Sequence, residues 1–154
     1  MKTQSLSDRQ QAAWMSYQRM RVRLAGRLSR ELARETGLSD ADFEILAHLA
    51  EAPDESVRSL ALRCGLEWEK SRLSHQLRRM EQRGLVTREA CAEDNRGAVV
   101  RVTDEGRRLA DEARRVHDRA VQRYVVDVLT PGQLDALGDI AETILSGLEE
   151  GHRP

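Results

Sequence analysis

Residues 67–84 read EWEKSRLSHQLRRMEQRG, and this stretch decides the fold. No Gly or Pro interrupts it before Gly84, so we expect one helix of about five turns. Its apolar side chains recur at the helical period and predict one buried stripe. They are Leu66, Leu73, Leu77 and Met80. The opposite face is cationic and rich in hydrogen-bond donors, which fits a helix in the major groove of DNA. It carries Trp68, Ser71, His75, Arg78, Arg79 and Gln82, with Arg72 beside them.

The positive charge of the chain is concentrated in this stretch. The formal net charge is −1, with 25 Lys and Arg against 26 Asp and Glu. Residues 70–88, however, carry six basic side chains and a single acidic one, Glu81. A short basic segment in a chain that is otherwise near neutral is the electrostatic pattern expected for contact with phosphates. A solvated helix face is the alternative, so the segments on either side have to decide between the two.

A β-hairpin is expected directly after the basic helix. Residues 85–89 (LVTRE) and 98–102 (AVVRV) alternate between apolar and polar side chains and are rich in β-prone residues. Between them, EDNRG at 93–97 is typical of a turn, with Arg96 at or near its tip. An arginine there can enter the minor groove, where the potential of DNA is most negative. An exposed loop arginine is the alternative interpretation.

The segment before the basic helix predicts the first half of a helix-turn-helix. Residues 56–58 are a short extended piece, and Ser59 is expected to cap a two-turn helix. The apolar residues 60–62 should pack inward, and Gly65 should end this helix in a tight turn. A short helix, a glycine-containing turn and a longer basic helix together form the helix-turn-helix pattern.

Longer helices are expected on both sides of this region, over about 8–35 and 39–51 before it and over about 104–129 and 131–150 after it. The apolar stripes of the terminal helices have no remaining domain to cover. Pairing with each other and with a second copy of the chain is the economical solution, while ordinary core packing is the alternative for the first helix.

The prediction is therefore a mainly α fold, an α+β winged helix. It has an N-terminal dimerisation helix (1–36), a winged helix-turn-helix DNA-binding domain with a two-stranded wing (37–103), and C-terminal dimerisation helices (104–154).

Composition excludes several classes of protein. The chain has 154 residues, no run of 18 apolar residues and no apolar segment typical of a signal peptide at its start, so we expect a cytoplasmic protein without a membrane partner. Cys64 and Cys91 form no C-x-x-C pair, and the four histidines have no metal-ligand spacing, so neither metal nor cofactor is expected. No catalytic motif occurs in the sequence, which argues against an enzyme.

Three segments together carry a family resemblance. Residues 73–86 end in MEQRGLV, residues 94–103 read DNRGAVVRVT, and residues 103–106 read TDEG. They are similar, in turn, to the recognition helix running into the wing, the D-x-R wing motif with its strand, and the T-x-x-G helix start of one family. The chain resembles the MarR family of winged helix-turn-helix transcription regulators over about residues 8–149.

The resemblance implies an obligate homodimer that binds a pseudo-palindromic operator, usually as a repressor. Arg96 matches the wing arginine that reaches the minor groove, and Asp94 matches the acidic residue that braces it. Lys70 is expected to hold phosphate. Trp68 stands where the family often has a small polar residue, so it either packs on the sugar-phosphate backbone or shields the turn. The residues on the stretch that enters the major groove are Ser71, Arg72, Ser74, His75, Arg78 and Arg79.

The resemblance also implies a small-molecule effector, because the family often binds aromatic acids or other hydrophobic compounds between dimer base and DNA-binding lobe. Residues of a type that could line such a pocket are Trp14, Tyr17, Arg21 and His48, although core packing is the alternative for the aromatic ones.

Two other functions stay open. One is a redox sensor that uses Cys91 on the wing or Cys64, although Cys64 is expected to be buried and inert. The other is a winged-helix module that binds protein instead of DNA. The basic segment at 70–88 argues against the second, because a wing that binds protein needs no such charge.

Overall fold

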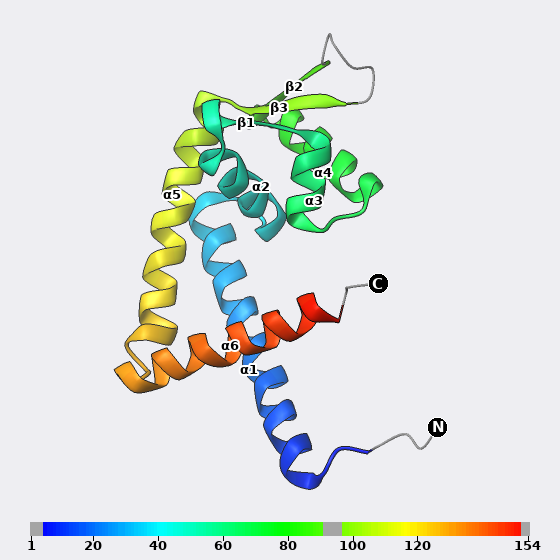
Figure 1. Cartoon of the computed structure of the whole chain (residues 1–154). Helices are drawn as coiled ribbons and strands as arrows, with labels where there is room; N and C mark the ends of the chain where they lie inside the picture. Colours follow the sequence, from blue (N-terminus) through cyan, green and yellow to red (C-terminus); the bar gives the residue numbers. More distant parts are fainter. Residues whose placement is uncertain (1–4, 91–96, 152–154) are drawn as a thin grey trace. The chain divides into compact units, whose positions relative to one another are not determined.

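A computed structural model of the chain describes residues 5–90 and 97–151 (Figure 1). The fold is mainly helical with a small antiparallel sheet, as predicted. The chain forms two compact units, one up to His117 and one from Asp118 onward. The elements in chain order are α1 (Asp8–Thr36), α2 (Asp40–Glu51), η1 (Pro53–Glu55), β1 (Ser56–Arg58), α3 (Ser59–Leu66), α4 (Lys70–Gln82), β2 (Val86–Ala90), β3 (Ala98–Val102), α5 (Asp104–Val121), η2 (Gln122–Val126) and α6 (Pro131–Glu150).

Local capping signals set the starts of three helices where the sequence predicted them. Ser7 begins α1, Ser39 begins α2 and Thr130 begins α6, each in a capping box with the side chain three residues later. At the other end of α1, Gly37 takes a left-handed φ of 73° and its N–H bonds to the carbonyl of Ala33. In each of these caps the hydrogen-bond donor and acceptor lie within four residues of each other in the sequence, so the caps form without a tertiary contact.

The turn between α3 and α4 differs from the prediction. We expected α3 to end at Gly65 and the basic helix to begin at Glu67, but α3 continues through Gly65 to Leu66. Glu67 takes a left-handed φ of 56°, and the N–H groups of Glu67 and Trp68 bond back to carbonyls in the last turn of α3. The α4 helix then begins at Lys70. A non-glycine residue therefore makes the turn.

Gly65 has a different role, which is to let two helices approach each other. A Cβ atom at Gly65 would lie 3.3 Å from the ring of His48 on α2, closer than most side-chain contacts. The absence of a side chain therefore allows the His48 ring to lie against the end of α3.

The sheet has three strands in the order β1-β3-β2. Its central strand β3 pairs antiparallel with both neighbours, so that Val100 lies opposite Val57 of β1 and Arg88 of β2. The sequence predicted the β2–β3 hairpin and an extended segment at 56–58, but not the pairing of that segment with β3. The expected two-stranded wing is thus joined at its base by a third strand.

The core of the first unit lies between α2, α4 and the sheet. Ile45, Leu46 and Leu49 of α2 are fully buried and pack with Met80 of α4 and Val100 of β3. The predicted apolar stripe is buried at Leu73, Leu77 and Met80 of α4, and partly buried at Leu66, which lies at the end of α3. Burying a large aliphatic side chain contributes about 1.5–3 kcal/mol, so this cluster is the main stabilising contact of α4.

Some residues expected in the core are exposed. Leu60 and Ala61 at the start of α3 face solvent, and only Leu62 of that predicted set is buried. On α2, the apolar residue Ala50 is exposed, while Phe43 is half-buried and packs against the ring of His117. The α3 helix has fewer than three turns and contacts the core along one edge, which leaves the first two residues of its apolar run exposed. Ser59, predicted as the cap, is the first residue of α3, and the capping position belongs to Arg58.

The start of α5 is pressed against the start of β2. The Thr103 hydroxyl donates to the carbonyl of Gly84 and accepts from the N–H of Gly106. A Cβ atom at Gly106 would lie 2.1 Å from the carbonyl oxygen of Leu85 and 2.9 Å from Val102. The TDEG segment at 103–106 therefore joins helix and sheet through a hydroxyl at one position and the absence of a side chain at another.

The second unit contains the end of α5, the π-helical segment η2 and α6. The apolar side chains of α6 are exposed in the isolated chain, from 38% at Leu134 to 66% at Leu148. No helix among the described residues is both long enough and apolar enough to cross a membrane.

Substituting Gly106→Ala should lower the free energy of unfolding by at least about 1–3 kcal/mol, because the added methyl group overlaps the Leu85 carbonyl. Urea unfolding followed by circular dichroism measures this change. Gly132→Ala is the matched control, because no atom lies within 4 Å of the new methyl group; its stability should stay within about 1 kcal/mol of the parent. Equal midpoints for both variants would contradict the close approach at Gly106.

Candidate nucleic-acid interface

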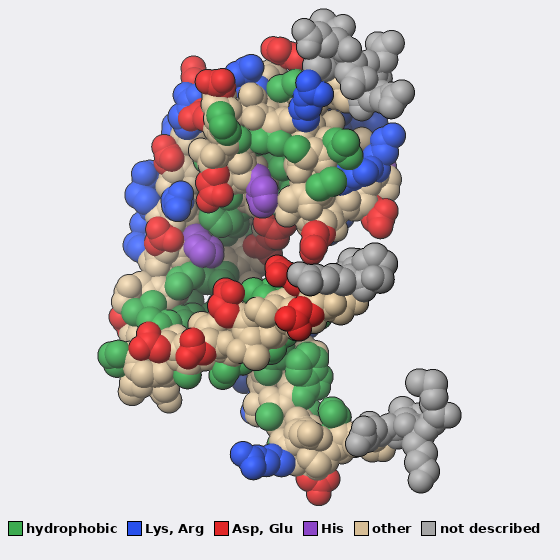
Figure 2. Space-filling view, viewed as in Figure 1, with side chains coloured by type: hydrophobic (Ala, Val, Ile, Leu, Met, Phe, Trp, Pro, Cys, Tyr) green, Lys and Arg blue, Asp and Glu red, His purple; other side chains and the backbone are tan. Residues whose placement is uncertain are grey.

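The outward face of α4 presents most of the predicted DNA-binding side chains to solvent. These exposed residues are Lys70, Ser71, Arg72, Ser74, His75, Arg78 and Arg79. Figure 2 shows Lys and Arg side chains gathered in the region where α4 lies. The helix is amphipathic, and its apolar stripe packs against α2 and the sheet. The polar residues of α4 therefore face solvent.

The C-terminal end of α4 is fixed by a glycine turn. Gly84 takes a φ of 74°, and the N–H groups of Gly84 and Leu85 bond to the carbonyls of Glu81 and Met80. This pair of bonds is a Schellman motif, in which a left-handed residue satisfies the last free carbonyls of a helix. Leu85, directly after the turn, is buried. The motif thus sets the angle at which β2 leaves the basic helix.

Two of the six basic side chains at 70–88 bind carboxylates within the chain. Arg83 contacts Asp42 at 2.7 Å and Arg88 contacts Glu81 at 3.2 Å. The hydrogen bond from Arg88 lowers the pKa of the Glu81 carboxyl below its usual value. The other four remain exposed on α4 and are Lys70, Arg72, Arg78 and Arg79. The cationic surface available to a ligand is therefore narrower than the charge count of the sequence suggested.

Trp68 does not lie on the outward face, where the sequence analysis placed it. Its side chain is only 8% exposed and belongs to the hydrophobic core. The guanidinium of Arg72 lies over its ring, 3.9 Å from the centroid. A large aromatic ring gains more from burial than from solvent, and its face attracts the cation. Of the two roles considered for Trp68, the shielding role matches this position.

A buried polar network lies beneath α4. The Asp42 carboxylate, 2% exposed, accepts hydrogen bonds from Gln76 at 2.6 Å and from Arg83 at 2.7 Å. Gln76, 5% exposed, accepts in turn from Arg79 at 2.7 Å. Arg83 also donates to the carbonyl of Gly37 at 3.3 Å. The network joins Asp42 of α2 to the buried side of α4 at Gln76, to its exposed side at Arg79 and to its C-terminal end at Arg83.

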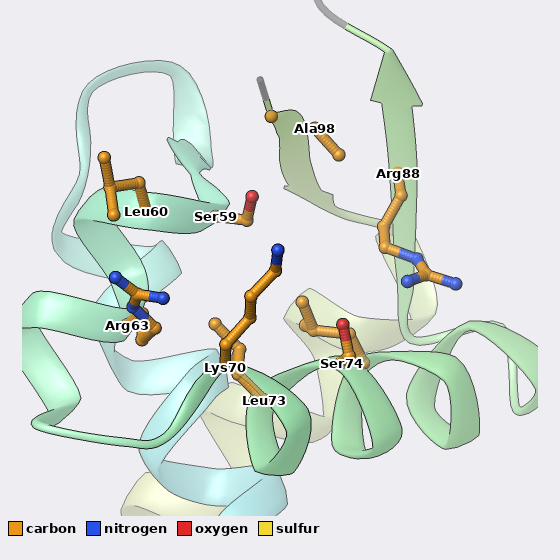
Figure 3. A pocket seen from close by; sticks show the side chains of 10 residues that line it. Ser59, Leu60, Arg63, Lys70, Leu73, Ser74, Arg88 and Ala98 are labelled. Atoms are coloured by element: carbon orange, nitrogen blue, oxygen red, sulfur yellow. The ribbon is translucent and has the colours of Figure 1, made fainter. Parts of the chain in front are cut away.

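A groove of about 520 Å³ lies between α3, α4 and the two wing strands (Figure 3). Lys70 reaches into it from α4 toward Ser59, while Arg88 lies on β2 at the far side. Arg63 adds a third cation, and leucines form an apolar part of the lining. The lining residues are Ser59, Leu60, Arg63, Lys70, Leu73, Ser74, Leu77, Arg88, Gly97 and Ala98. Such a lining can hold an anion such as a phosphate.

Of the polar residues in this groove, the sequence predicted Lys70 and Ser74 as DNA contacts, and Arg88 only as part of the basic segment. Arg63 and Ser59 were missed because they lie on the short helix, which was treated as a packing element. Their spacing of four residues puts both on one side of α3, and Leu60 is exposed beside them. The signal that could have identified them was the i, i+4 pair of polar residues on α3, the first helix of the helix-turn-helix.

Three predicted positions lie outside the described residues: Asp94, Arg96 and Cys91. Cys64, expected to be buried, is exposed, because it lies on the solvent side of the last turns of α3. The four candidate pocket residues are divided between two helices. Trp14 and Tyr17 stack on α1 with ring centroids 5.3 Å apart, and Arg21 of α1 donates to Gln18. His48 lies on α2, and none of the four lines the groove.

Comparison with known proteins shows the family. The model of the MarR family matches residues 36–97, from the last residue of α1 to the residue before β3. Sco3205, a MarR family transcriptional regulator from Streptomyces coelicolor whose crystal structure is in complex with DNA, has 35% sequence identity and a TM-score of 0.88. The similarity covers 96% of this chain and 92% of that one. This chain belongs to the MarR family. It is accordingly a transcriptional regulator with a winged helix-turn-helix, as the resemblance in its sequence predicted.

Two further proteins are similar to this chain. CouR from Rhodococcus jostii RHA1, crystallised bound to p-coumaroyl-CoA, has 26% identity and a TM-score of 0.71, with 92% of this chain and 95% of that one covered. The uncharacterized HTH-type transcriptional regulator YdgJ of Bacillus subtilis (strain 168) is 28% identical over 93 residues. This match spans 60% of the chain and 56% of YdgJ, little more than half of that protein.

The burial of Trp68 can be tested by fluorescence. Trp14→Phe leaves Trp68 as the only tryptophan, since the chain has two. Its emission should be blue-shifted and weakly quenched by acrylamide, because the ring is 8% exposed. Adding duplex DNA should leave the quenching of Trp68 unchanged. Strong quenching that DNA relieves would instead place the ring at the DNA surface.

Proposed function

We propose that this MarR family regulator binds a pseudo-palindromic operator as a homodimer and represses transcription. The observation that carries the proposal is the exposed cationic face of α4 beside a groove, which Lys70 of that face lines together with Arg63 of α3 and Arg88 of β2. The DNA complex of Sco3205, which shares 35% identity, supports DNA as the partner. A dimer bound across a promoter blocks polymerase by occupying the site.

The side chains divide into those that read bases and those that hold phosphates. On this proposal Arg72 and Arg79 donate to guanine O6 and N7 in the major groove, where each bidentate contact discriminates by about 1–3 kcal/mol. Lys70 and Arg63 neutralise phosphates along the groove and set the register. For the wing we propose a minor-groove contact by Arg96, braced by Asp94, from the sequence motif alone.

The operator and the roles of these side chains are tested together by selecting bound duplexes from a random pool at physiological salt. We expect a two-fold symmetric site whose half-sites lie about one helical turn apart, roughly 34–36 Å. Arg72→Ala should relax base preference at one position of each half-site and cost about 1–3 kcal/mol. Lys70→Ala should weaken binding on every sequence and reduce the salt slope by about one. An affinity that does not change with salt would argue against DNA as the partner.

The homodimer is supported by apolar helix faces that the single chain leaves uncovered. On α1, Trp14, Met15 and Met20 are between 43% and 61% exposed, and the α6 leucines and isoleucines are similarly open. So many large apolar side chains left exposed on two helices are typical of an interface. The two helices also differ in charge, since α1 carries seven arginines against three acidic residues, whereas α6 carries five acidic residues and no Lys or Arg. Figure 2 shows these acidic side chains along α6.

Ile144→Glu on α6 should raise the dimer dissociation constant by about 100-fold or more, because a carboxylate buried without a partner costs several kcal/mol. Sedimentation equilibrium measures this constant. Ser146→Glu adds the same charge roughly opposite on the helix and should leave the protein dimeric. A dimer that tolerates Ile144→Glu unchanged would show that this side of α6 is not the interface.

We further propose that a small-molecule effector shifts the population of dimer geometries and so releases the operator. The p-coumaroyl-CoA complex of CouR supports a ligand-responsive mode of control. A compound can only shift such an equilibrium by its difference in affinity for the two geometries. Trp14, Tyr17, Arg21 and His48 remain the proposed pocket residues, from the types of their side chains.

A further inference from the structure

We propose that Gln76 is a positioning residue that sets the direction of Arg79 for contact with DNA, and that Asp42 holds Gln76 in turn. The inference rests on the DNA-binding function proposed above. It extends that function from the exposed side chains of α4 to two buried ones that cannot touch DNA themselves.

Asp42 is the fixed end of this chain of hydrogen bonds. Its Oδ2 accepts from the backbone N–H of Ser39 at 2.9 Å and from Nη1 of Arg83 at 2.7 Å, while its Oδ1 accepts from Nε2 of Gln76 at 2.6 Å. A carboxylate buried to 2% exposure is stable only when donors surround it. Because Ser39 is the cap of α2 and Arg83 ends α4, the carboxylate cannot turn without breaking a contact at both helices.

The carboxylate decides which way the amide of Gln76 points. An ionised carboxylate is an acceptor only, so the amide must direct its NH₂ group toward Asp42. Its Oε1 then faces the other way, where it accepts from Nη2 of Arg79 at 2.7 Å. If the amide were reversed, its oxygen would face the Asp42 carboxylate and its NH₂ group would face the Arg79 guanidinium, and neither pair can form a hydrogen bond. The orientation of Gln76 thus follows from the charge of Asp42.

The hydrogen bond to Gln76 holds the Arg79 side chain but leaves most of its N–H donors available for DNA. The side chain is exposed on the outer face of α4, and a guanidinium has five N–H donors in a rigid plane, of which Gln76 occupies one. A guanidinium that is already ordered loses less conformational entropy when it binds. Arg78, the preceding residue, is also exposed and makes no contact with Asp42 or Gln76, so it is the matched comparison on the same helix.

The alternative is that Gln76 only fills space beneath α4. Gln76→Leu separates the two roles, because leucine is of similar size and suits a buried site but cannot bond to Arg79 or Asp42. A side chain that only fills space would change stability and affect all contacts of α4 alike. A positioning residue would affect the contribution of Arg79 alone.

The experiment is a double-mutant cycle on operator affinity, with folding and dimer state checked by circular dichroism and sedimentation. Arg79→Ala should weaken binding about 10-fold or more, and Gln76→Leu alone at least about 3-fold, through the loss of ordering of one rotamer-rich side chain. In the Arg79→Ala background, Gln76→Leu should cost nothing further. Arg78→Ala should cost the same factor with and without Gln76→Leu. Gln76→Met serves in the same cycle if the leucine variant does not fold.

Three results would overturn the inference. The first is an affinity unchanged by Gln76→Leu, and the second is a loss that persists at full size in the Arg79→Ala background. The third is an operator affinity unchanged by Arg79→Ala, which would remove Arg79 as a contact while leaving DNA binding intact. Failure of the proposed function is distinguishable from all three, because the parent protein itself would then bind no duplex.

Discussion

The buried carboxylate of Asp42 is the constraint on which the position of α4, the helix proposed to contact DNA, depends. Its donors come from the start of α2 and from the middle and end of α4. Removing one partner from a buried charge costs far more than the pair contributes when intact, so α4 cannot slide or rotate on α2 by even one residue. Apolar contacts such as those of Leu77 and Met80 hold the helix down, but they tolerate small shifts that a directional network does not.

The arginines of the basic segment at 70–88 have two different roles. Arg83 and Arg88 bind Asp42 and Glu81 and so contribute to the structure of the lobe. Arg72 and Arg79 lie outside, yet each is held from beneath, one by the face of Trp68 and the other by Gln76. A surface made only of free arginines would attract phosphates equally well but would have little geometric preference among bases. The supporting residues are what can convert attraction into readout.

Sequence reasoning succeeded where the deciding bonds are local. The capping boxes at Ser7, Ser39 and Thr130 and the glycine turn at Gly84 involve partners within five residues, so the pattern alone predicts them. It failed where the deciding contact is distant or lacks a residue signature. The pairing of 56–58 with β3 spans more than forty residues, and Glu67 makes a left-handed turn that favours glycine elsewhere. The helical period predicted the burial of Leu73, Leu77 and Met80, but neither it nor the family resemblance predicted the burial of Gln76 and Trp68.

The winged lobe and the terminal helices differ in whether the single chain already supplies the contacts that their side chains need. In the described part of the lobe the buried polar side-chain atoms all have hydrogen-bond partners, so it has little to gain from further contacts except with a ligand. The apolar faces of α1 and α6 are still exposed in the single chain. If a second copy covers them, as proposed, two α4 helices are held on one scaffold and the second half-site binds at a high effective concentration. Each lobe then needs only a few cations, since affinity comes from holding two modest interfaces at the correct separation. A change in that separation would remove one interface entirely, which is why control through dimer geometry would suit a lobe with four exposed cations on α4.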